Sequence, residues 1–387
     1  MTDARTRRRR VVIAHPSPDL YGSDRQLLET VEALRDHGWQ ALVQLPEAGP
    51  LVPELQARGA LVRIAAFPVL RKSLLRPVSL LALPWRMAAS TLALVGVLRR
   101  SRGALVYVNT VTIPQWLLAA RLARMPVLCH VHEAEQDQAI VVRRLMAAPL
   151  LLAQRVIANS GAARRAVVDV VPALDGTVTV VHNGVPGPPA AASPPARHQA
   201  AQPATIALVA RLSPRKGIDV ALEATALLAA QGRDVRLVVC GTVFPGYEWY
   251  EEQLRERSAR ADLAGRVTLA GYVHPTWPVL AEADVVIVPS RAEPFGNTAV
   301  EGLLSRRPVV ASDVQGLAEV VVDGRTGVLV PPDDPPALAW AIAALLDDPA
   351  AAARLAQAGH DDAVERFGVA RYGAAVAGIA ATVAGRG

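Results

Sequence analysis

The chain has 387 residues, of which 51% are apolar and 4% aromatic, and its formal net charge is +6. This length exceeds the size at which one hydrophobic core usually keeps growing, which argues against a single small module and predicts two domains. The two cysteines, Cys129 and Cys240, lie far apart in apolar runs. That spacing excludes a disulfide framework or a cysteine-based metal site and predicts two buried thiols.

Residues 1–10 form a basic N-terminal tail with five arginines and one aspartate, which supplies most of the net charge. An arginine cluster can bind nucleic acid or anionic lipid, but a solvated terminus explains it as well. We favour the solvated terminus and do not expect a nucleic-acid partner. The apolar stretch that follows, 11–14, is too short for the core of a signal peptide, so we expect a cytoplasmic protein.

The segment 11–184 alternates apolar runs with helical patterns. An amphipathic helix follows the first strand and runs to about His37, where Gly38 ends it. Continuous apolar strands between helices predict a parallel sheet covered on both faces, as in a Rossmann-like, doubly wound domain. The predicted strands are 11–14, 41–44, 61–64, 104–108 and 127–131.

Residues 71–102 contain seven basic side chains and no acidic one around two apolar stretches, 74–83 and 87–98. These stretches are too short to cross a bilayer, and Pro77, Pro84 and Arg86 interrupt them. Two interpretations remain open. The segment is either a surface that docks on anionic lipid and presents a lipid-linked acceptor, or a helix packed in its domain with arginines at the edges.

A second domain follows a Pro- and Ala-rich linker at 185–203. It covers 204–365, and a C-terminal helix at 366–387 can pack back on the first domain. Ligands of such sheets bind beyond the carboxyl ends of the strands, so two domains facing each other place a ligand in the cleft between them. The predicted strands of the second domain are 205–210, 235–240, 267–270, 285–289, 309–311 and 328–330.

Two cations, Arg211 and Lys216, lie in the loop between the first strand and the first helix of this second domain. Cations at that place can neutralise a phosphate, and the amides at the helix start add partial positive charge. The loop therefore predicts an anion site. The alternative is that both side chains are ordinary solvated loop residues.

Glu293 and Glu301 flank a turn that opens a helix after the strand at 285–289. Gly296 permits close approach of the backbone, and the amides of Asn297 and Thr298 can form a second anion cradle. Carboxylates bind phosphate poorly but accept well from hydroxyls, which suits sugar hydroxyls beside a pyrophosphate. The alternatives are an exposed helical glutamate for Glu301 and a capping role for Glu293.

Together these segments resemble a retaining, GT-B-fold glycosyltransferase of family 4, also called group 1. The resemblance implies two Rossmann-like doubly wound domains facing across a cleft. It is carried by five segments in order, namely 211–217, 271–273, 293–301, 308–321 and 323–331.

The resemblance implies roles for the donor-site residues of the second domain. Arg211 and Lys216 would hold the donor diphosphate, and Glu301 would hold the nucleotide ribose. Glu293 would bind the transferred sugar together with backbone amides. Those amides belong to Phe295, Gly296, Asn297 and Thr298, and Tyr272 and Val273 would lie near the base.

The first domain resembles the family more weakly. Gly22-Ser23 stands where members often have paired glycines in a donor-binding loop. His132 matches a family histidine near the donor sugar and the reaction centre, so the resemblance makes it a candidate catalytic residue. Strand alternation places His130 on the same face. A purely structural strand-end histidine is the alternative for each.

The resemblance further implies metal-independent transfer with retention, from a nucleotide-sugar donor to a sugar, a lipid-linked or another small-molecule acceptor, in cell-envelope or other glycoconjugate synthesis. No metal or other cofactor is expected, because cations hold the diphosphate and no clear Asp-x-Asp motif is present. The leaving phosphate, rather than Glu293, would deprotonate the acceptor. The alternatives are a phosphorylase, a nucleotide-sugar epimerase, and a non-catalytic binding paralogue.

Overall fold

The computed structural model describes residues 9–70, 77–134, 138–190, 202–244 and 246–385, with backbone only for 77–84. The chain forms two compact units, one of Met1–Gly184 with Val369–Gly387 and the other of Val185–Gly368. The second unit thus begins inside the predicted linker. The reason is that Val185 is buried in its core and donates its backbone N–H to the Phe367 carbonyl at 2.9 Å.

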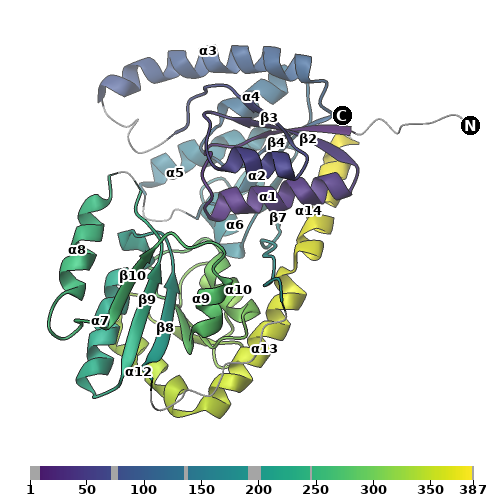
Figure 1. Ribbon diagram of the computed structural model, residues 1–387. Coiled ribbons are helices and arrows are strands. Elements are labelled where there is room, and N and C mark those ends of the chain that lie inside the picture. The colour runs from purple at the N-terminus through teal and green to yellow at the C-terminus, as the bar shows by residue number, and fades with distance from the viewer. Residues whose placement is uncertain (1–8, 71–76, 135–137, 191–201, 245, 386–387) are drawn as a thin grey trace, which may run out of the picture. The chain divides into compact units, whose positions relative to one another are not determined.

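The described residues of the first unit form a seven-stranded parallel sheet in the order β3-β2-β1-β4-β5-β6-β7 (Figure 1). Its strands are β1 (Arg9–Ala14), β2 (Trp39–Leu45), β3 (Leu61–Ile64), β4 (Leu105–Val108), β5 (Val127–Val131), β6 (Arg155–Ala158) and β7 (Val178–Val180). Its α-helices are α1 (Gly22–Asp36), α2 (Leu51–Ala57), α3 (Pro77–Ser101), α4 (Gln115–Leu122), α5 (Ile140–Ala147), α6 (Gly161–Val168) and α14 (Val369–Ala384).

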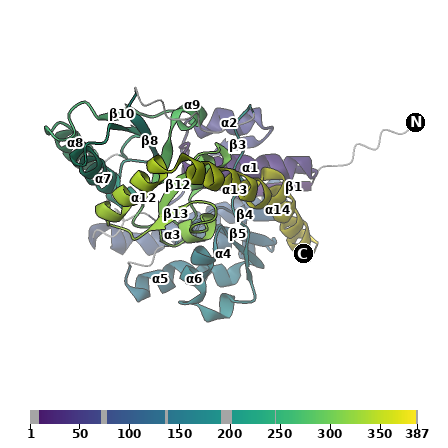
Figure 2. The same cartoon turned by 90° about the horizontal axis from the view of Figure 1, so that it is seen from below.

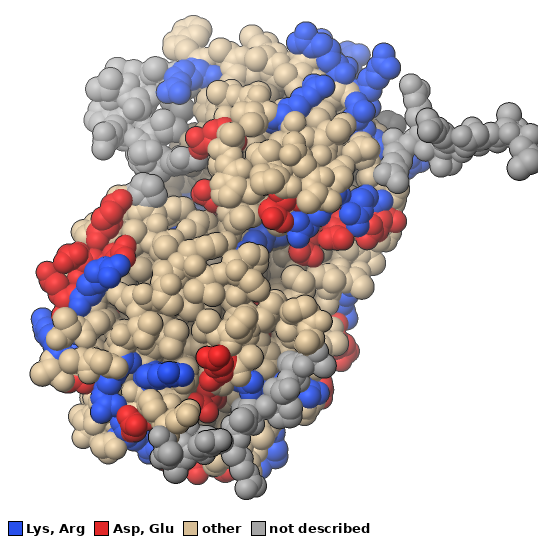
Figure 3. Space-filling model, viewed as in Figure 1, with Lys and Arg blue, Asp and Glu red and all other residues tan. Residues whose placement is uncertain are grey.

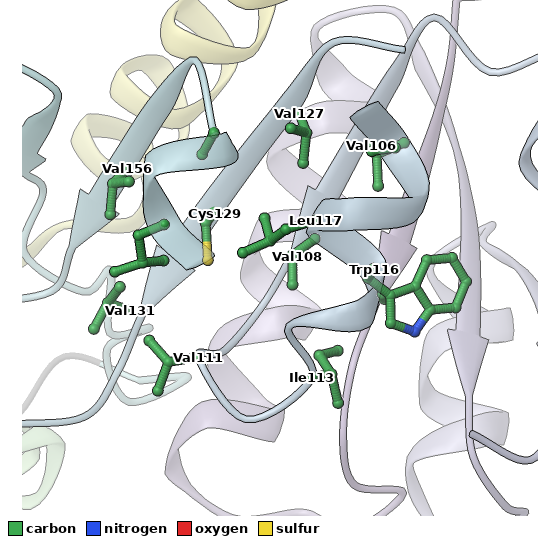
Figure 4. Packing of buried hydrophobic residues seen from close by; sticks show 14 of the residues in the cluster. Val106, Val108, Val111, Ile113, Trp116, Leu117, Val127, Cys129, Val131 and Val156 are labelled. Carbon is green, nitrogen blue, oxygen red and sulfur yellow. The ribbon is translucent and has the colours of Figure 1, made fainter. Parts of the chain in front are cut away.

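Helices cover both faces of this sheet, as the continuous apolar strands predict. Val11 and Ile13 of β1 pack on one face with residues of α1 and α14, whereas Val12 and Ala14 pack on the other with α3 and α4. On that second face Trp116 meets Phe67 edge to face, with ring centroids 5.4 Å apart. Figure 4 shows part of this cluster, including Val106, Val108, Leu117, Val127, Cys129 and Val131. Cys129 and Cys240 are both buried, as expected.

The described residues of the second unit form a six-stranded parallel sheet in the order β10-β9-β8-β11-β12-β13 (Figures 1 and 2). Its strands are β8 (Ala204–Val209), β9 (Val235–Cys240), β10 (Val267–Gly271), β11 (Val285–Val288), β12 (Val309–Ser312) and β13 (Val328–Val330). Its α-helices are α7 (Ile218–Ala230), α8 (Glu248–Ser258), α9 (Trp277–Glu282), α10 (Asn297–Leu304), α11 (Leu317–Val320), α12 (Pro335–Asp347) and α13 (Pro349–Phe367).

Helices α13 and α14 together form the one stretch, among the described residues, that is long and apolar enough to cross a membrane by length and composition. The stretch is interrupted at Gly368, whose backbone is extended. Phe367 of α13 is buried in the core of the second unit, and Val376 of α14 is buried in that of the first. The predicted 366–387 helix therefore begins three residues later, at Val369.

Each sheet has a topological switch point, where chain order changes direction between two neighbouring strands. In the first unit the switch lies between β1 and β4, and in the second between β8 and β11. Ligands of open α/β sheets bind beyond the carboxyl ends of the strands at such a point. The two switch points are therefore the places at which to examine side chains.

Candidate active site

At the switch point of the second unit, Lys216 and Glu293 form an ion pair. Lys216 ends a 3-10 turn, Pro214–Lys216, that follows β8, and Glu293 lies in the loop after β11. The Lys216 ammonium contacts Glu293 Oε2, and the two side chains are 19% and 14% exposed. Ser290 Oγ lies 3.5 Å from the same carboxylate oxygen. The structure thus joins two predicted residues that are far apart in sequence, and Glu293 does not act as the helix cap considered as its alternative.

Two glycines permit close contacts at this switch point. Gly217 has φ +66°, and a Cβ there would lie 1.9 Å from the carbonyl oxygen of Pro289, so no L side chain fits without moving the backbone. Gly296 has φ +114°, and a Cβ there would lie 2.5 Å from Leu317 Cδ2 of α11. The loops after β8 and β11 therefore touch at Gly217, whereas Gly296 lets the loop after β11 approach α11.

Arg291 ties the same loops together, and the sequence reasoning did not single it out. Its guanidinium donates to Asp219 at 2.6 Å and to Asp333 at 2.6 Å, and its backbone N–H donates to the Arg215 carbonyl at 2.9 Å. Hydrogen bonds to Asp219 raise the pKa of Arg291 above its usual value. Asp219 also accepts from the Tyr250 hydroxyl at 2.7 Å. The network holds the loops by charge-assisted bonds.

Arg211, the other predicted cation, follows β8 directly and is half-buried. Its guanidinium carbon lies 3.1 Å from the centroid of the Phe244 ring, a cation–π arrangement that restrains the side chain. Phe244 follows β9, so the ring and the cation come from neighbouring strand ends. The guanidinium is the planar, permanently charged group that suits a phosphate.

Helix α10 carries the remaining residues of the predicted anion cradle. It begins after Gly296, and the first amides of a helix have no acceptor within the helix, so those of Asn297 and Thr298 point out of its start. The Phe295 side chain is buried and packs edge to face on Phe367. Only the backbone of Phe295 can therefore serve a ligand.

Glu301 is half-buried on the second turn of α10. Its Oε2 accepts a hydrogen bond from Thr276 Oγ1 at 3.2 Å, so it is not a plain exposed helical glutamate. Thr276 precedes α9 and was missed in the sequence, where a lone threonine carries no signal. Tyr272 and Val273 follow β10, the edge strand, and Tyr272 is 47% exposed. Both residues therefore lie at the edge of the sheet, beyond the end of β10.

At the switch point of the first unit, four polar side chains form a hydrogen-bonded chain. His15 follows β1, Asn109 follows β4 and His132 follows β5, while Asp24 lies in the first turn of α1. His132 Nε2 bonds Asn109 Oδ1 at 2.9 Å, Asn109 Nδ2 bonds His15 Nδ1 at 2.9 Å, and His15 Nε2 bonds Asp24 Oδ1 at 2.7 Å. Sequence reasoning identified only His132 of these.

His130 lies beneath His132, with ring centroids 4.0 Å apart, as strand alternation predicts. It is fully buried, and its Nδ1 shares a 2.7 Å hydrogen bond with the Tyr107 hydroxyl. Burial lowers the pKa of His130 to about 3. Burial, followed by the nearby His130 and His15, also holds the pKa of His132 well below its usual value. Both rings are therefore neutral at physiological pH.

Gly22 and Ser23 form the first turn of α1, immediately before Asp24. Asp24 Oδ2 accepts the backbone N–H of Tyr21 at 2.9 Å and so caps this turn. Gly22 is exposed. The cation of this turn, Arg25, donates from Nε to the Leu20 carbonyl at 3.2 Å. Among the described residues no group of three or more His, Cys, Asp and Glu is arranged to hold a metal ion.

Comparison with known proteins covers both units. Residues 21–186 match the model of glycosyltransferase family 4, and residues 203–348 match that of glycosyl transferases group 1. The chain is 34% identical to alpha-D-kanosaminyltransferase of Streptomyces kanamyceticus over 173 residues, 44% of each chain. It is 37% identical to D-inositol 3-phosphate glycosyltransferase 2 of Catenulispora acidiphila over 247 residues, 59% of this chain and 56% of the relative. The chain spans about half the length of these curated relatives.

Solved structures share the fold over the whole chain. Anabaena HepE in complex with UDP superimposes with a TM-score of 0.80 at 25% identity, covering 97% of this chain and 100% of that one. Sucrose-phosphate synthase from Thermosynechococcus elongatus superimposes with a TM-score of 0.76 at 21% identity, covering 98% and 100%. Through both of its units, the chain therefore belongs to the family 4, group 1 glycosyltransferases of the GT-B fold.

Proposed function

We propose that the chain is a retaining glycosyltransferase that moves a sugar from a nucleotide-diphosphate sugar to an acceptor hydroxyl. The observation that carries the proposal is the meeting of Lys216 and Glu293 at the switch point of the second unit, with Arg211 in the same loop as Lys216 and the start of α10 next to Glu293. Two cations and a helix start suit a diphosphate, and a carboxylate beside them suits sugar hydroxyls. The HepE structure that holds UDP supports a nucleotide-sugar donor.

In this proposal, Arg211 and Lys216 stabilise the charge that develops on the leaving diphosphate. Preorganised cations and amides at a leaving group are usually a large contribution to catalysis. Lys216 is already oriented by Glu293, so little reorganisation is needed when a phosphate oxygen shares the ammonium. No metal or other cofactor is part of the proposed step, because these residues supply the positive charge.

Glu293 serves as a grip on the transferred sugar rather than as a nucleophile. Its Oε2 is engaged by Lys216, which stabilises the carboxylate and reduces its reactivity. Retention then follows if the leaving phosphate takes the acceptor proton on the face that it vacates. Glu301, oriented by Thr276, accepts from the ribose hydroxyls, and Tyr272 and Val273 lie beside the base.

His132 is the proposed contribution of the first unit. Its ring is neutral and held by Asn109, which suits a hydrogen bond to a hydroxyl of the transferred sugar. Gly22 and Ser23, in the first turn of α1, offer backbone amides to the donor.

The acceptor side of the proposal rests on a basic and apolar surface of the first unit. In α3, Leu94 and Leu98 are buried in the core, whereas Trp85 and Leu92 are 81% and 70% exposed. Arg86, Arg99 and Arg100 of the same helix are exposed. Both sequence interpretations thus find support, because one face of the helix packs inward and the other is apolar and basic. Residues 71–76 lie outside the described residues.

Helix α5 of the same unit also exposes apolar side chains, since Ile140, Val141 and Leu145 are exposed, as is Arg144. Figure 3 shows Lys and Arg side chains along α3, whereas acidic side chains gather over α8 of the second unit. Such a surface supports peripheral contact with an anionic membrane and a lipid-linked acceptor. We therefore propose a cytoplasmic enzyme that works at the inner face of the membrane in cell-envelope polysaccharide or glycolipid synthesis.

A thermal-shift screen tests the donor. The full chain is heated with UDP, GDP, ADP and their sugars, and with inorganic phosphate as a control. A ligand that binds the native state stabilises it by about 2.7 kcal/mol at one hundred times its dissociation constant. We expect one nucleotide and its sugar to raise the melting temperature while phosphate does not. Stabilisation by phosphate alone would favour a phosphorylase, and stabilisation by none would contradict a nucleotide-sugar donor.

A further inference from the structure

The chain of four side chains at the first switch point fixes the proton positions of every ring within it. His15, Asp24 and Asn109 are all buried, so water does not compete for their hydrogen bonds. Each link is a short, direct contact, from His132 to Asn109, from Asn109 to His15 and from His15 to Asp24. Its members come from three strand ends and one helix, which makes it a built arrangement rather than a local turn.

The orientation of the Asn109 amide fixes one order of donors and acceptors along this chain. A carboxylate only accepts, so His15 donates from Nε2 to Asp24, and its Nδ1 accepts because the Asn109 amide nitrogen faces it. Asn109 must then present its amide nitrogen to His15 and its carbonyl oxygen to His132. His132 consequently donates from Nε2. The charge of Asp24 thus sets the tautomer of the His132 ring, three hydrogen bonds further along the chain.

We propose that Asp24, His15 and Asn109 are positioning residues that hold His132 as the neutral tautomer with its proton on Nε2. Nδ1 is then the ring atom left to accept a hydrogen bond. It is buried and has no hydrogen-bond partner among the described residues, so its lone pair is available to a hydroxyl donor. The assignment of that donor to the transferred sugar rests on the proposed function.

The neighbours of His132 do not compete with this order. His130 stacks on its ring, and Glu133 accepts the backbone N–H of His132 at 2.9 Å and the Thr110 hydroxyl. Glu133 thus engages the backbone of His132 rather than its ring. Because burial raises the pKa of Glu133 and lowers that of both histidines, the groups around the ring favour their neutral forms. A neutral imidazole carries its proton on one of its two nitrogens, and the hydrogen bond to Asn109 places that proton on Nε2.

Nuclear magnetic resonance of the full chain labelled with 15N-histidine tests the tautomer directly. The His132 signals are assigned by their loss in His132→Gln. We expect a protonated Nε2, a bare Nδ1 and a slowly exchanging Nε2 proton. Asn109→Asp retains an acceptor and should keep that proton, whereas Asn109→Leu should lose it. Asn159→Leu, a buried asparagine after β6, is the matched control and should leave the His132 signals unchanged.

A proton on Nδ1 of His132 in the wild type would overturn the inference, as would an unchanged, protected Nε2 proton in Asn109→Leu. Kinetics give a second readout. Asn109→Leu and His132→Phe should each lower kcat about tenfold with little change in donor KM, and the double variant should lose no more than either alone. Additive losses would contradict a role through His132. If the spectra agree but neither variant alters kcat, the sugar contact fails while the positioning chain stands.

Discussion

The two switch points occupy equivalent places in their sheets but differ in the charge of the side chains that gather there. In the second unit Lys216 and Glu293 form a partly exposed ion pair. In the first, a hydrogen-bonded chain of two imidazole rings and one amide ends on the carboxylate of Asp24. Burial holds the pKa of His132 well below its usual value, so its ring can orient a hydroxyl but cannot balance a diphosphate. We therefore expect the charge that stabilises the leaving group to come from the second unit.

The largest expected effect is on the charged site. Lys216→Ala removes the ammonium that offsets the leaving charge, and kcat/KM should fall roughly a hundredfold to a thousandfold. Steady-state transfer assays measure the loss. Arg215→Ala, an exposed neighbour whose backbone alone bonds Arg291, is the matched control and should retain activity. Equal loss in both variants would show a general field effect rather than a specific site.

The buried histidines of the first unit should make the free energy of unfolding depend on pH in the acidic range. His130 has a pKa of about 3 when folded and about 6.5 when unfolded, so only the unfolded chain binds the proton between these values. The contribution of His130 to the free energy of unfolding is therefore fully present above pH 6.5. Below that pH it decreases by about 1.4 kcal/mol per pH unit.

Urea unfolding at pH 7 and pH 4.5 measures the effect, and His130→Gln should remove about 3 kcal/mol of the difference. Comparing the two chains isolates His130, because Glu29, with a pKa raised to about 7, gives the opposite slope in both. His37→Gln, at an exposed helix end, should keep the wild-type slope. An identical slope in His130→Gln would contradict a neutral, buried ring.

The glycine contact under the charged site gives a smaller effect. Gly217 and Gly232 both have positive φ, but a Cβ at Gly217 meets the Pro289 carbonyl, whereas one at Gly232 meets nothing within 4 Å. Gly232→Ala should cost about 1 kcal/mol, the conformational penalty alone. Gly217→Ala should cost at least about 2 kcal/mol more in urea unfolding, since the backbone must shift. Equal costs would show that the two loops do not need to touch.

The smallest effect concerns the membrane surface of the first unit. Arg99→Gln with Arg100→Gln should weaken sedimentation with phosphatidylglycerol vesicles by about 1 kcal/mol per arginine. Trp85→Ser should weaken it further. Trp340→Ser removes an equally exposed tryptophan from α12 of the second unit and serves as the control. Vesicle binding that depends on Trp340 rather than Trp85 would place the membrane contact on the second unit and contradict the proposal.

The sequence predicted most strands because they are continuous apolar runs. The segments 61–64, 127–131, 235–240 and 328–330 coincide with observed strands. Strands β6 and β7 were missed, although β3 and β13, which have the same lengths, were predicted. The start of the second unit at Val185 could not be predicted, because Val185 bonds Phe367, which lies far along the chain.

The residues of the candidate site also differ in how far the sequence predicts them. Lys216, Glu293 and Glu301 lie in segments whose order along the chain resembles a family, so they could be proposed from the sequence. Their partners could not, because pairs such as Arg291 with Asp219 meet only after the parallel sheet brings distant strand ends together. The polar chain from Asp24 to His132 is the clearest case, since it joins residues from four separate elements.

Calorimetry tests the difference between the two switch points most directly. It measures the affinity of the chain for a nucleoside diphosphate and for its parent nucleoside, with the base that stabilises the wild type in the thermal-shift screen. Lys216→Ala should weaken the diphosphate at least tenfold and leave the nucleoside unchanged, whereas Asn109→Leu should alter neither. Unchanged diphosphate affinity in Lys216→Ala, or a greater loss in Asn109→Leu, would contradict the assignment of the leaving-group charge to the second unit.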